Sequence, residues 1–203
     1  MHLRASRRRN LPHFLLAIAR TGSKIAAMIV CGIDPGLDTT GYAIVRCDGV
    51  GRASILDAGI LRTSPRANLA DRLVQLADDF AEVLLQWKPA AVGVEQLYAH
   101  YKHPRTAIQM GHARGVLLAA AARNGATVSN FSATHVKKHL TGNGRASKTQ
   151  VQQAVQSLFR LPSMPEPPDL ADAIAIAFCC GNSATATVAP DESRDTTSLH
   201  ASF

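Results

Sequence analysis

Short apolar runs near residue 28 are spaced like strands. Residues 28–34 (MIVCGID) form a continuous apolar run, which is typical of a central strand. Pro35-Gly36 ends this run, and the next one, at 41–47 (GYAIVRC), follows too soon for a helical crossover. A third run at 55–62 comes after a turn at 48–52. The pattern predicts three strands in sequence, joined by short loops.

Helical periodicity then begins and alternates with further strands. We expect Ser64 to cap a helix with Pro65 at its first position, and Pro89 to end it. Apolar residues recur there at three- and four-residue steps, as on one stripe of a helix: Leu69, Leu73, Leu76, Phe80, Leu84 and Trp87. A fourth strand is expected at 91–95 (AVGVE), which, like the first, ends on an acid.

The rest of the sequence continues this alternation. We expect a fifth strand at 127–131 and helices at 105–123, 136–140, 148–159 and from Asp169 to about Cys180. Small residues share one face of the first of these helices and suit close packing on its own sheet or on a second copy: Ala107, Gly111, Gly115, Ala119 and Ala122. Three strands followed by alternating helices and strands predict an α/β fold, a five-stranded mixed sheet with helices on both faces.

The two ends differ in composition from this core. Residues 1–27 hold six basic residues and no acid, so the net charge of +7 falls to +1 without them. We interpret this segment as a start assigned too early, with Met28 the true first residue, or as a disordered basic arm; a transit peptide stays open. Residues 181–203 lose periodicity and predict a disordered tail. The expected domain therefore covers residues 28–180.

Charge inside the domain is unevenly distributed. No acid occurs between Glu95 and Glu166, whereas nine basic residues do. Such a stretch suits an enzyme that grips phosphates beside a metal site, although solvated helix faces would give the same pattern. No apolar run reaches the roughly 18–20 residues of a membrane span. The four cysteines lack CxxC spacing, which favours structural thiols in a reducing cytosol.

Four acidic residues stand where they could meet. Asp34 and Glu95 each end a buried strand, a costly position unless a metal or a partner compensates the charge. Asp169 and Asp172 lie three apart in the first turn of the last helix, although acids at a helix start also have a purely structural explanation. Oxygen ligands without nearby cysteine or histidine favour Mg²⁺ or Mn²⁺, and two such ions can flank a scissile phosphate.

These residues lie in motifs that resemble the RuvC family of bacterial Holliday-junction resolvases, which has a ribonuclease H-like fold. The likeness covers roughly 28–180 in six stretches: GIDPG with TGYA at 32–43, VGVEQ at 92–96, GHARGV at 111–116, VKK at 136–138, GNGRASKTQV at 142–151 and DLADAIAIA at 169–177. The resemblance implies an endonuclease that resolves junctions by paired, metal-dependent nicks in recombination and repair.

The resemblance also implies roles for single residues. Asp34, Glu95, Asp169 and Asp172 would be catalytic ligands of two Mg²⁺ ions per subunit, with Mn²⁺ as a substitute. The expected DNA contacts are Lys137 and Lys148 near the scissile phosphate, Tyr98 stacking on opened bases, and Lys138 and Arg145. Tyr98 stands where the family commonly has Phe. The implied partners are junction DNA, a second copy of the chain and the RuvA and RuvB branch-migration proteins, in the bacterial cytoplasm and away from membranes.

Three other interpretations remain open at this point. GIDPGLDTTGYA also resembles the phosphate loop of actin-like ATPases and sugar kinases, although those folds need a second such loop. The RuvX nuclease family shares the fold and the first motif, but it is shorter and places its middle acid in another context. A module that binds junctions without cutting would use the basic residues and Tyr98 but would not need four converging acids.

Overall fold

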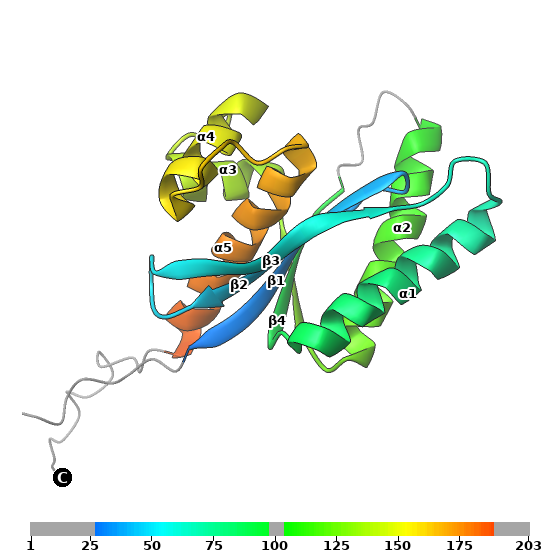
Figure 1. The fold of residues 1–203 in the computed structure, drawn as a ribbon, viewed down its shortest axis with the longest axis horizontal. Helices are drawn as coiled ribbons and strands as arrows, with labels where there is room; N and C mark the ends of the chain where they lie inside the picture. Colours follow the sequence, from blue (N-terminus) through cyan, green and yellow to red (C-terminus); the bar gives the residue numbers. More distant parts are fainter. Residues whose placement is uncertain (1–26, 98–103, 189–203) are drawn as a thin grey trace, which may run out of the picture.

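A mixed five-stranded sheet runs between two layers of helices (Figure 1). The structure, a computed structural model, describes residues 27–97 and 104–188. Its elements in chain order are β1 (Met28–Asp34), β2 (Thr39–Cys47), β3 (Ala53–Arg62), α1 (Leu69–Trp87), β4 (Ala91–Glu95), α2 (Pro104–Arg123), β5 (Thr127–Phe131), α3 (Ala133–Thr141), α4 (Lys148–Phe159) and α5 (Pro168–Val188). This confirms the predicted α/β class and the five strands.

The strand order places β1 at the centre of the sheet. The order is β3-β2-β1-β4-β5, with antiparallel pairing from β3 to β1 and parallel pairing from β1 to β5. Ile33 of β1 is in register with Val94 of β4. The carboxyl ends of these two strands therefore lie side by side at one edge of the sheet, as the sequence predicted from their terminal acids.

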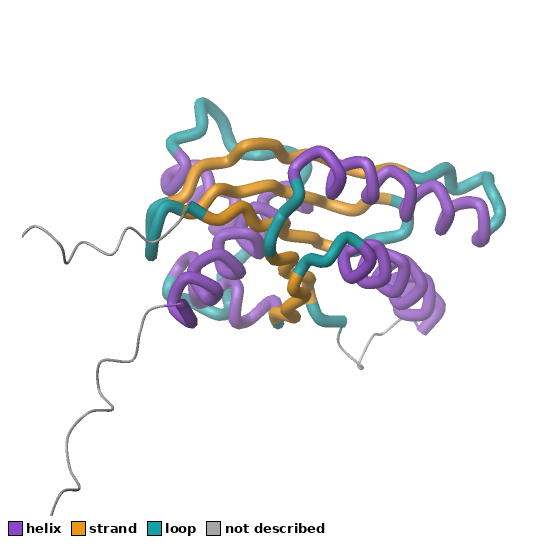
Figure 2. The backbone as a smooth tube through the Cα atoms, turned by 90° about the horizontal axis from the view of Figure 1, so that it is seen from below, coloured by secondary structure: helices purple, strands orange, loops and turns teal. Residues whose placement is uncertain are grey.

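Each face of the sheet carries its own apolar layer. The helices α1 and α2 cover one face, and α3, α4 and α5 lie on the other (Figures 1 and 2). On the first face, Leu76, Phe80 and Leu84 of the predicted apolar stripe are fully buried. On the second face, buried apolar residues of α5 pack against β1 and β2, and those of α4 pack mainly against α5. Burial of both faces explains why β1 is apolar at nearly every position.

Two glycines let α5 approach the sheet closely. A Cβ on Gly32 of β1 would lie 2.2 Å from the main-chain oxygen of Ala173, and one on Gly41 of β2 would lie 2.3 Å from that of Asp169. Any larger residue would push the helix away from the strands. The glycines of GIDPG and TGYA therefore set the distance between the first turn of α5 and the end of β1.

The start of α1 differs from the prediction. Ser64 and Pro65 do not begin a helix; α1 starts at Leu69, and the Asn68 side chain caps it by accepting from the Asp71 N–H. The chain just before Ser64 is anchored to the loop after β1, because the Thr63 hydroxyl donates to the Leu37 carbonyl at 2.6 Å. A tertiary contact to the loop after β1 thus overrides a local helix-start signal.

The end of α5 also differs, since the helix continues past the expected end near Cys180 to Val188. Gly181 packs so closely on Cys47 that an added Cβ would lie 2.1 Å from its Sγ atom. Asn182 accepts a hydrogen bond from the Gly51 N–H at 3.0 Å. Contacts with the β2–β3 turn therefore extend a helix whose own sequence had lost its apolar period. Residues 1–26 and 189–203 lie outside the described part of the chain.

The small-residue face of α2 is turned to solvent. Gly111, Gly115, Ala119 and Ala122 are exposed, and so is Ile108 at 62%. The opposite face of the helix, with Ala113, Leu117, Ala120 and Ala121, is the one that packs on the core. The alternative that this small-residue face packs on its own sheet is therefore wrong.

All four cysteines are buried and carry no disulfide. Burial raises the pKa of Cys47 and Cys179 to about 11, so these thiols stay protonated at neutral pH. None of the described helices is both long and apolar enough to cross a membrane.

Candidate active site

Three aspartates converge where β1 ends and α5 begins. Asp34, Asp169 and Asp172 each offer a carboxylate oxygen, and the three oxygens lie within 4.8 Å of one another. The end of β1 supplies the first; the first turn of α5 supplies Asp169, and the following turn supplies Asp172. The close approach of α5 at Gly32 and Gly41 brings the two elements together. The sequence predicted this convergence from strand-end and helix-start positions.

Glu95 joins this group from the neighbouring strand. It ends β4, its carboxyl group is hydrogen-bonded to that of Asp34, and it lines the same cleft. It is not one of the three residues whose oxygens converge within 4.8 Å. The four predicted acids therefore share one site, with Glu95 at its margin.

Burial and mutual repulsion change the acidity of the site. The pKa of Asp34 rises to about 8, first because the group is buried and then because Glu95, Asp172 and Asp169 are close; Lys148 opposes the rise. Burial and Asp172 raise the pKa of Glu95 to about 7, against Lys137, Lys148 and the hydrogen bond with Asp34. Burial also raises the pKa of Asp172. Without a cation, Asp34 is therefore mostly protonated at neutral pH and Glu95 about half protonated.

The acids line a cleft of about 360 Å³ that is open to solvent. Polar and apolar residues line it together, from the ends of β1 and β4, the β1–β2 loop, the start of β2 and four helices: Asp34, Pro35, Gly36, Thr39, Glu95, Met110, Ala133, Val136, Lys137, Lys148, Val151, Asp169, Asp172 and Ile176. An open, acid-floored cleft with basic side chains at its wall suits an extended anionic substrate better than a small enclosed ligand.

Two of the predicted lysines reach the carboxylates. Lys148 is the first residue of α4, where Ser147 and Gln150 form a capping box that fixes the helix start. Its Nζ atom lies 3.7 Å from Oδ1 of Asp169. Lys137 of α3 lines the cleft and lowers the pKa of Glu95. The structure thus places both lysines beside the acids.

The other predicted DNA contacts lie farther out. Lys138 and Arg145 are exposed and do not line the cleft. Tyr98 falls outside the described residues, one position after Leu97. Among the described residues, neither Lys138 nor Arg145 therefore contributes to the cleft.

Two residues at the site had no assigned role in the sequence. The Thr39 hydroxyl donates to Oδ2 of Asp169 at 3.2 Å, so both oxygens of that aspartate have neighbours. In the sequence, Thr39 is marked only by its position two residues before Gly41, the glycine that packs against the main chain of Asp169. Arg114 lies inside the quoted GHARGV stretch, and its Nε donates to the main-chain oxygen of Glu95 at 3.0 Å.

The donor set fits divalent ions of the Mg²⁺ or Mn²⁺ type. All the converging ligand atoms are carboxylate oxygens, which these ions prefer. Burial raises the pKa values of Asp34 and Glu95 most, and repulsion from the neighbouring carboxylates adds to the rise. A cation between them would relieve this repulsion and keep the acids ionised.

Comparisons with known proteins match this chain to one protein family. The profile of one protein family, described as crossover junction endodeoxyribonuclease RuvC, matches residues 30–180. A protein of that name from Rhodopirellula baltica is 46% identical over 161 residues, covering 79% of this chain and 88% of the relative. Another from Heliobacterium modesticaldum is 41% identical over 162 residues, covering 80% and 99%.

Solved structures give the same result. A Thermus thermophilus RuvC in complex with a Holliday junction substrate is 34% identical, with a TM-score of 0.74 over 79% of this chain and 96% of that one. The yeast mitochondrial Holliday junction resolvase Ydc2 is 16% identical, with a TM-score of 0.54 over 75% of this chain and 78% of that one, and shows the shared fold.

Proposed function

The chain belongs to the RuvC family of crossover junction endodeoxyribonucleases. We propose that it cuts four-way DNA junctions by paired nicks, with Asp34, Glu95, Asp169 and Asp172 as its catalytic residues. The enzyme hydrolyses phosphodiester bonds of DNA. The observation that carries the assignment of residues is the convergence of three aspartates within 4.8 Å at the end of β1. A protein that only binds junctions would have no use for this convergence.

The carboxylates are proposed to hold two Mg²⁺ ions per subunit, for which Mn²⁺ can substitute. Bound ions would activate the attacking water and stabilise the leaving 3′ oxygen. Asp34, Glu95 and Asp172 are partly buried ligands, since burial is the largest cause that raises the pKa of each. The Thr39 hydroxyl orients the Asp169 carboxylate, to which it donates at 3.2 Å.

The basic side chains are proposed to bind the phosphate backbone. Lys137 and Lys148 stand at the wall of the cleft, where each can contact the scissile phosphate and offset the negative charge of the floor. Lys138 and Arg145 would contact phosphates farther along the arms, since Lys138 on α3 and Arg145 in the α3–α4 turn are both exposed. Tyr98 would stack on bases opened at the crossover, because every base offers an aromatic face.

A two-fold homodimer is proposed as the working assembly. A four-way junction needs two matching nicks, and an isologous dimer places two identical sites about one axis. The solvent-facing small residues of α2, with exposed Ile108 beside them, offer a face that two helices could share at close distance. RuvA and RuvB are the proposed further partners, and the cytoplasm is the proposed compartment.

Cleavage of a synthetic four-way junction tests the proposal. We expect the wild-type protein to cut the junction in Mg²⁺ but not in EDTA, and to leave a linear duplex of the same sequence intact. Asp34→Asn should retain junction binding while cleavage falls to below about 1% of wild type, because a lost ligand cripples the metal site and removes negative charge from the cleft.

Three outcomes would contradict the proposal. Junction binding without cleavage in either metal would favour the binding module. Cleavage by Asp34→Asn at a rate near wild type would remove this residue from the active site. Hydrolysis of ATP without cleavage of the junction would favour the ATPase interpretation.

A further inference from the structure

An arginine on α2 holds the main chain of the strand end that carries Glu95. Nε of Arg114 lies 3.0 Å from the main-chain oxygen of Glu95 and donates a hydrogen bond to it. A second guanidinium nitrogen donates to the side-chain oxygen of Asn130, on β5. The side chain is half-buried. One residue thus ties α2 to both β4 and β5 at the edge where the carboxylates converge.

The sheet itself has no donor for this carbonyl. The peptide between Glu95 and Gln96 directs its N–H towards β5, where it donates to the Phe131 oxygen at 2.9 Å. The carbonyl of the same peptide therefore points the other way, towards β1. The last registered pair of β1 and β4 is Ile33 with Val94, and beyond Asp34 the chain continues into Pro35, which has no N–H. Arg114 supplies the hydrogen bond that the neighbouring strand cannot.

This peptide decides where the Glu95 side chain enters the cleft. Glu95 is the last residue of β4, and its carboxyl group is hydrogen-bonded to that of Asp34. Regular pairing no longer fixes the chain beyond this point. Arg114 does not line the cleft, so it acts on Glu95 through the main chain and not by direct contact with the carboxylates.

We propose that Arg114 is a positioning residue for the cleavage reaction, which fixes the Glu95 peptide and through it the direction of the Glu95 carboxylate. The inference rests on the proposed function, since it takes Glu95 as a member of the metal site. Ligands in metal sites depend on such outer hydrogen bonds, whose loss commonly costs about 10–100-fold in metal affinity or activity. If the hydrogen bonds of Arg114 served only to join α2 to the sheet, their loss would lower the stability of the protein but would not change its affinity for metal ions.

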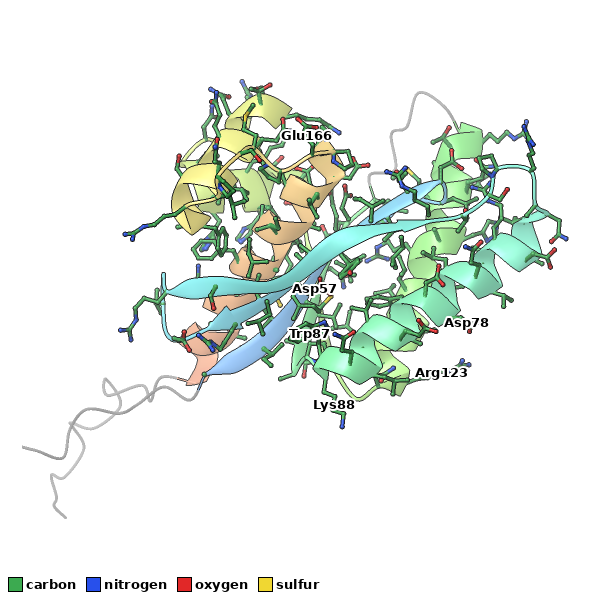
Figure 3. All side chains as sticks on the ribbon, viewed as in Figure 1. Asp57, Asp78, Trp87, Lys88, Arg123 and Glu166 are labelled. Carbon is green, nitrogen blue, oxygen red and sulfur yellow. The ribbon has the colours of Figure 1, made fainter. Side chains whose placement is uncertain are left out.

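The test compares variants of the full chain. Arg114→Ala removes both hydrogen bonds, whereas Arg114→Lys keeps one donor. Arg123→Ala is the matched control, since Arg123 is exposed at the other end of the same helix (Figure 3). The readouts are Mn²⁺ binding to the DNA-free protein by electron paramagnetic resonance, single-turnover junction cleavage against Mg²⁺ concentration, junction binding in EDTA and Tm.

We expect Arg114→Ala to bind junctions as wild type does, but to lose about 10-fold or more in Mn²⁺ affinity and about 10–100-fold in cleavage rate. Arg114→Lys should be intermediate in both, and Arg123→Ala should match wild type. Wild-type Mn²⁺ affinity and cleavage in Arg114→Ala would overturn the inference. If Arg114→Ala does not fold, Arg114→Lys decides: wild-type metal affinity there would overturn it. A wild-type protein that failed to cleave would overturn the proposed function, while the Mn²⁺ comparison would still test the positioning role.

Discussion

Acidic side chains that are forced together dominate the energetics of the site at the scale of single residues. The pKa of Asp34 is about 8 and that of Glu95 about 7, so the folded, metal-free protein holds protons that the unfolded chain releases near pH 4. Stability contributed by these groups is therefore fully present below about pH 4, falls progressively as the pH rises, and is lost once the pH has passed about 7 to 8. At a pH at which the carboxylates are ionised and can bind a cation, the metal-free site therefore destabilises the folded protein.

A first prediction follows for unfolding in EDTA. Between pH 6 and pH 8.5, the wild-type protein should lose about 1–3 kcal/mol more stability than Asp34→Asn, which cannot ionise at this position. At pH 8.5 the variant should be the more stable of the two. Urea unfolding at both pH values measures the difference, and Mg²⁺ should restore the wild type but not the variant. Equal pH dependence of the two proteins would show that Asp34 is not under this repulsion.

Whole elements set the direction of the site residues. The loop between β1 and β2 is held from α1, where buried Arg72 donates to the Thr63 hydroxyl at 2.9 Å and to the Asp38 carboxylate. On the same face of the sheet, Asp57 of β3 accepts from the Trp87 indole N–H at 3.2 Å, and both residues are labelled in Figure 3. These hydrogen bonds hold α1 against β3 and against the loop that follows Asp34.

The lysines of α3 and α4 give a second prediction. Lys148→Ala and Lys137→Ala should stay folded, slow cleavage at saturating junction by about 10-fold or more, and reduce the salt dependence of binding by about one unit of slope for each lost phosphate contact. Lys138→Ala, on α3 but outside the cleft, is the control. It should reduce the salt slope without changing the rate of the bound complex. Unchanged rate and slope in Lys148→Ala would mean that this lysine is merely solvated.

Most elements could be predicted because their signals are local. The apolar run of β1, the stripe of α1 and the turn between α3 and α4 specify structure through nearby residues. The start of α1 was mispredicted because the contact of Thr63 with Leu37 is tertiary, and the end of α5 because Gly181 and Asn182 pack on the β2–β3 turn. Arg114 could not be assigned from the sequence, since its acceptor on Glu95 is a main-chain atom.

The placement of the acids could be predicted for a different reason. A charged residue at the end of a buried strand is rare enough to indicate function, and parallel neighbours bring such residues to one edge. Their order along the chain does not reveal the close approach of α5 to β1. Only the structure shows that Gly32 and Gly41 set this distance.

At the scale of the whole molecule, paired nicking of a four-way junction requires two active sites. One subunit offers one cleft with the converging aspartates, on the described part of the chain. A junction has near two-fold symmetry, so two clefts related by one axis can nick opposed strands in one binding event. The exposed face of α2, which leaves Gly111 and Gly115 uncovered, is the surface we expect the two subunits to share.

A supercoiled plasmid that extrudes a cruciform tests this account most directly, because paired nicks at the four-way junction convert it to a linear product, whereas a single nick gives an open circle. In Mg²⁺ the wild-type protein should give mainly linear plasmid with ends that ligase can seal at the nicks. In EDTA, or with Asp34→Asn, the plasmid should stay supercoiled. Mainly open circles from the wild-type protein would contradict paired resolution, and an uncut plasmid in Mg²⁺ would contradict the proposed nuclease site itself.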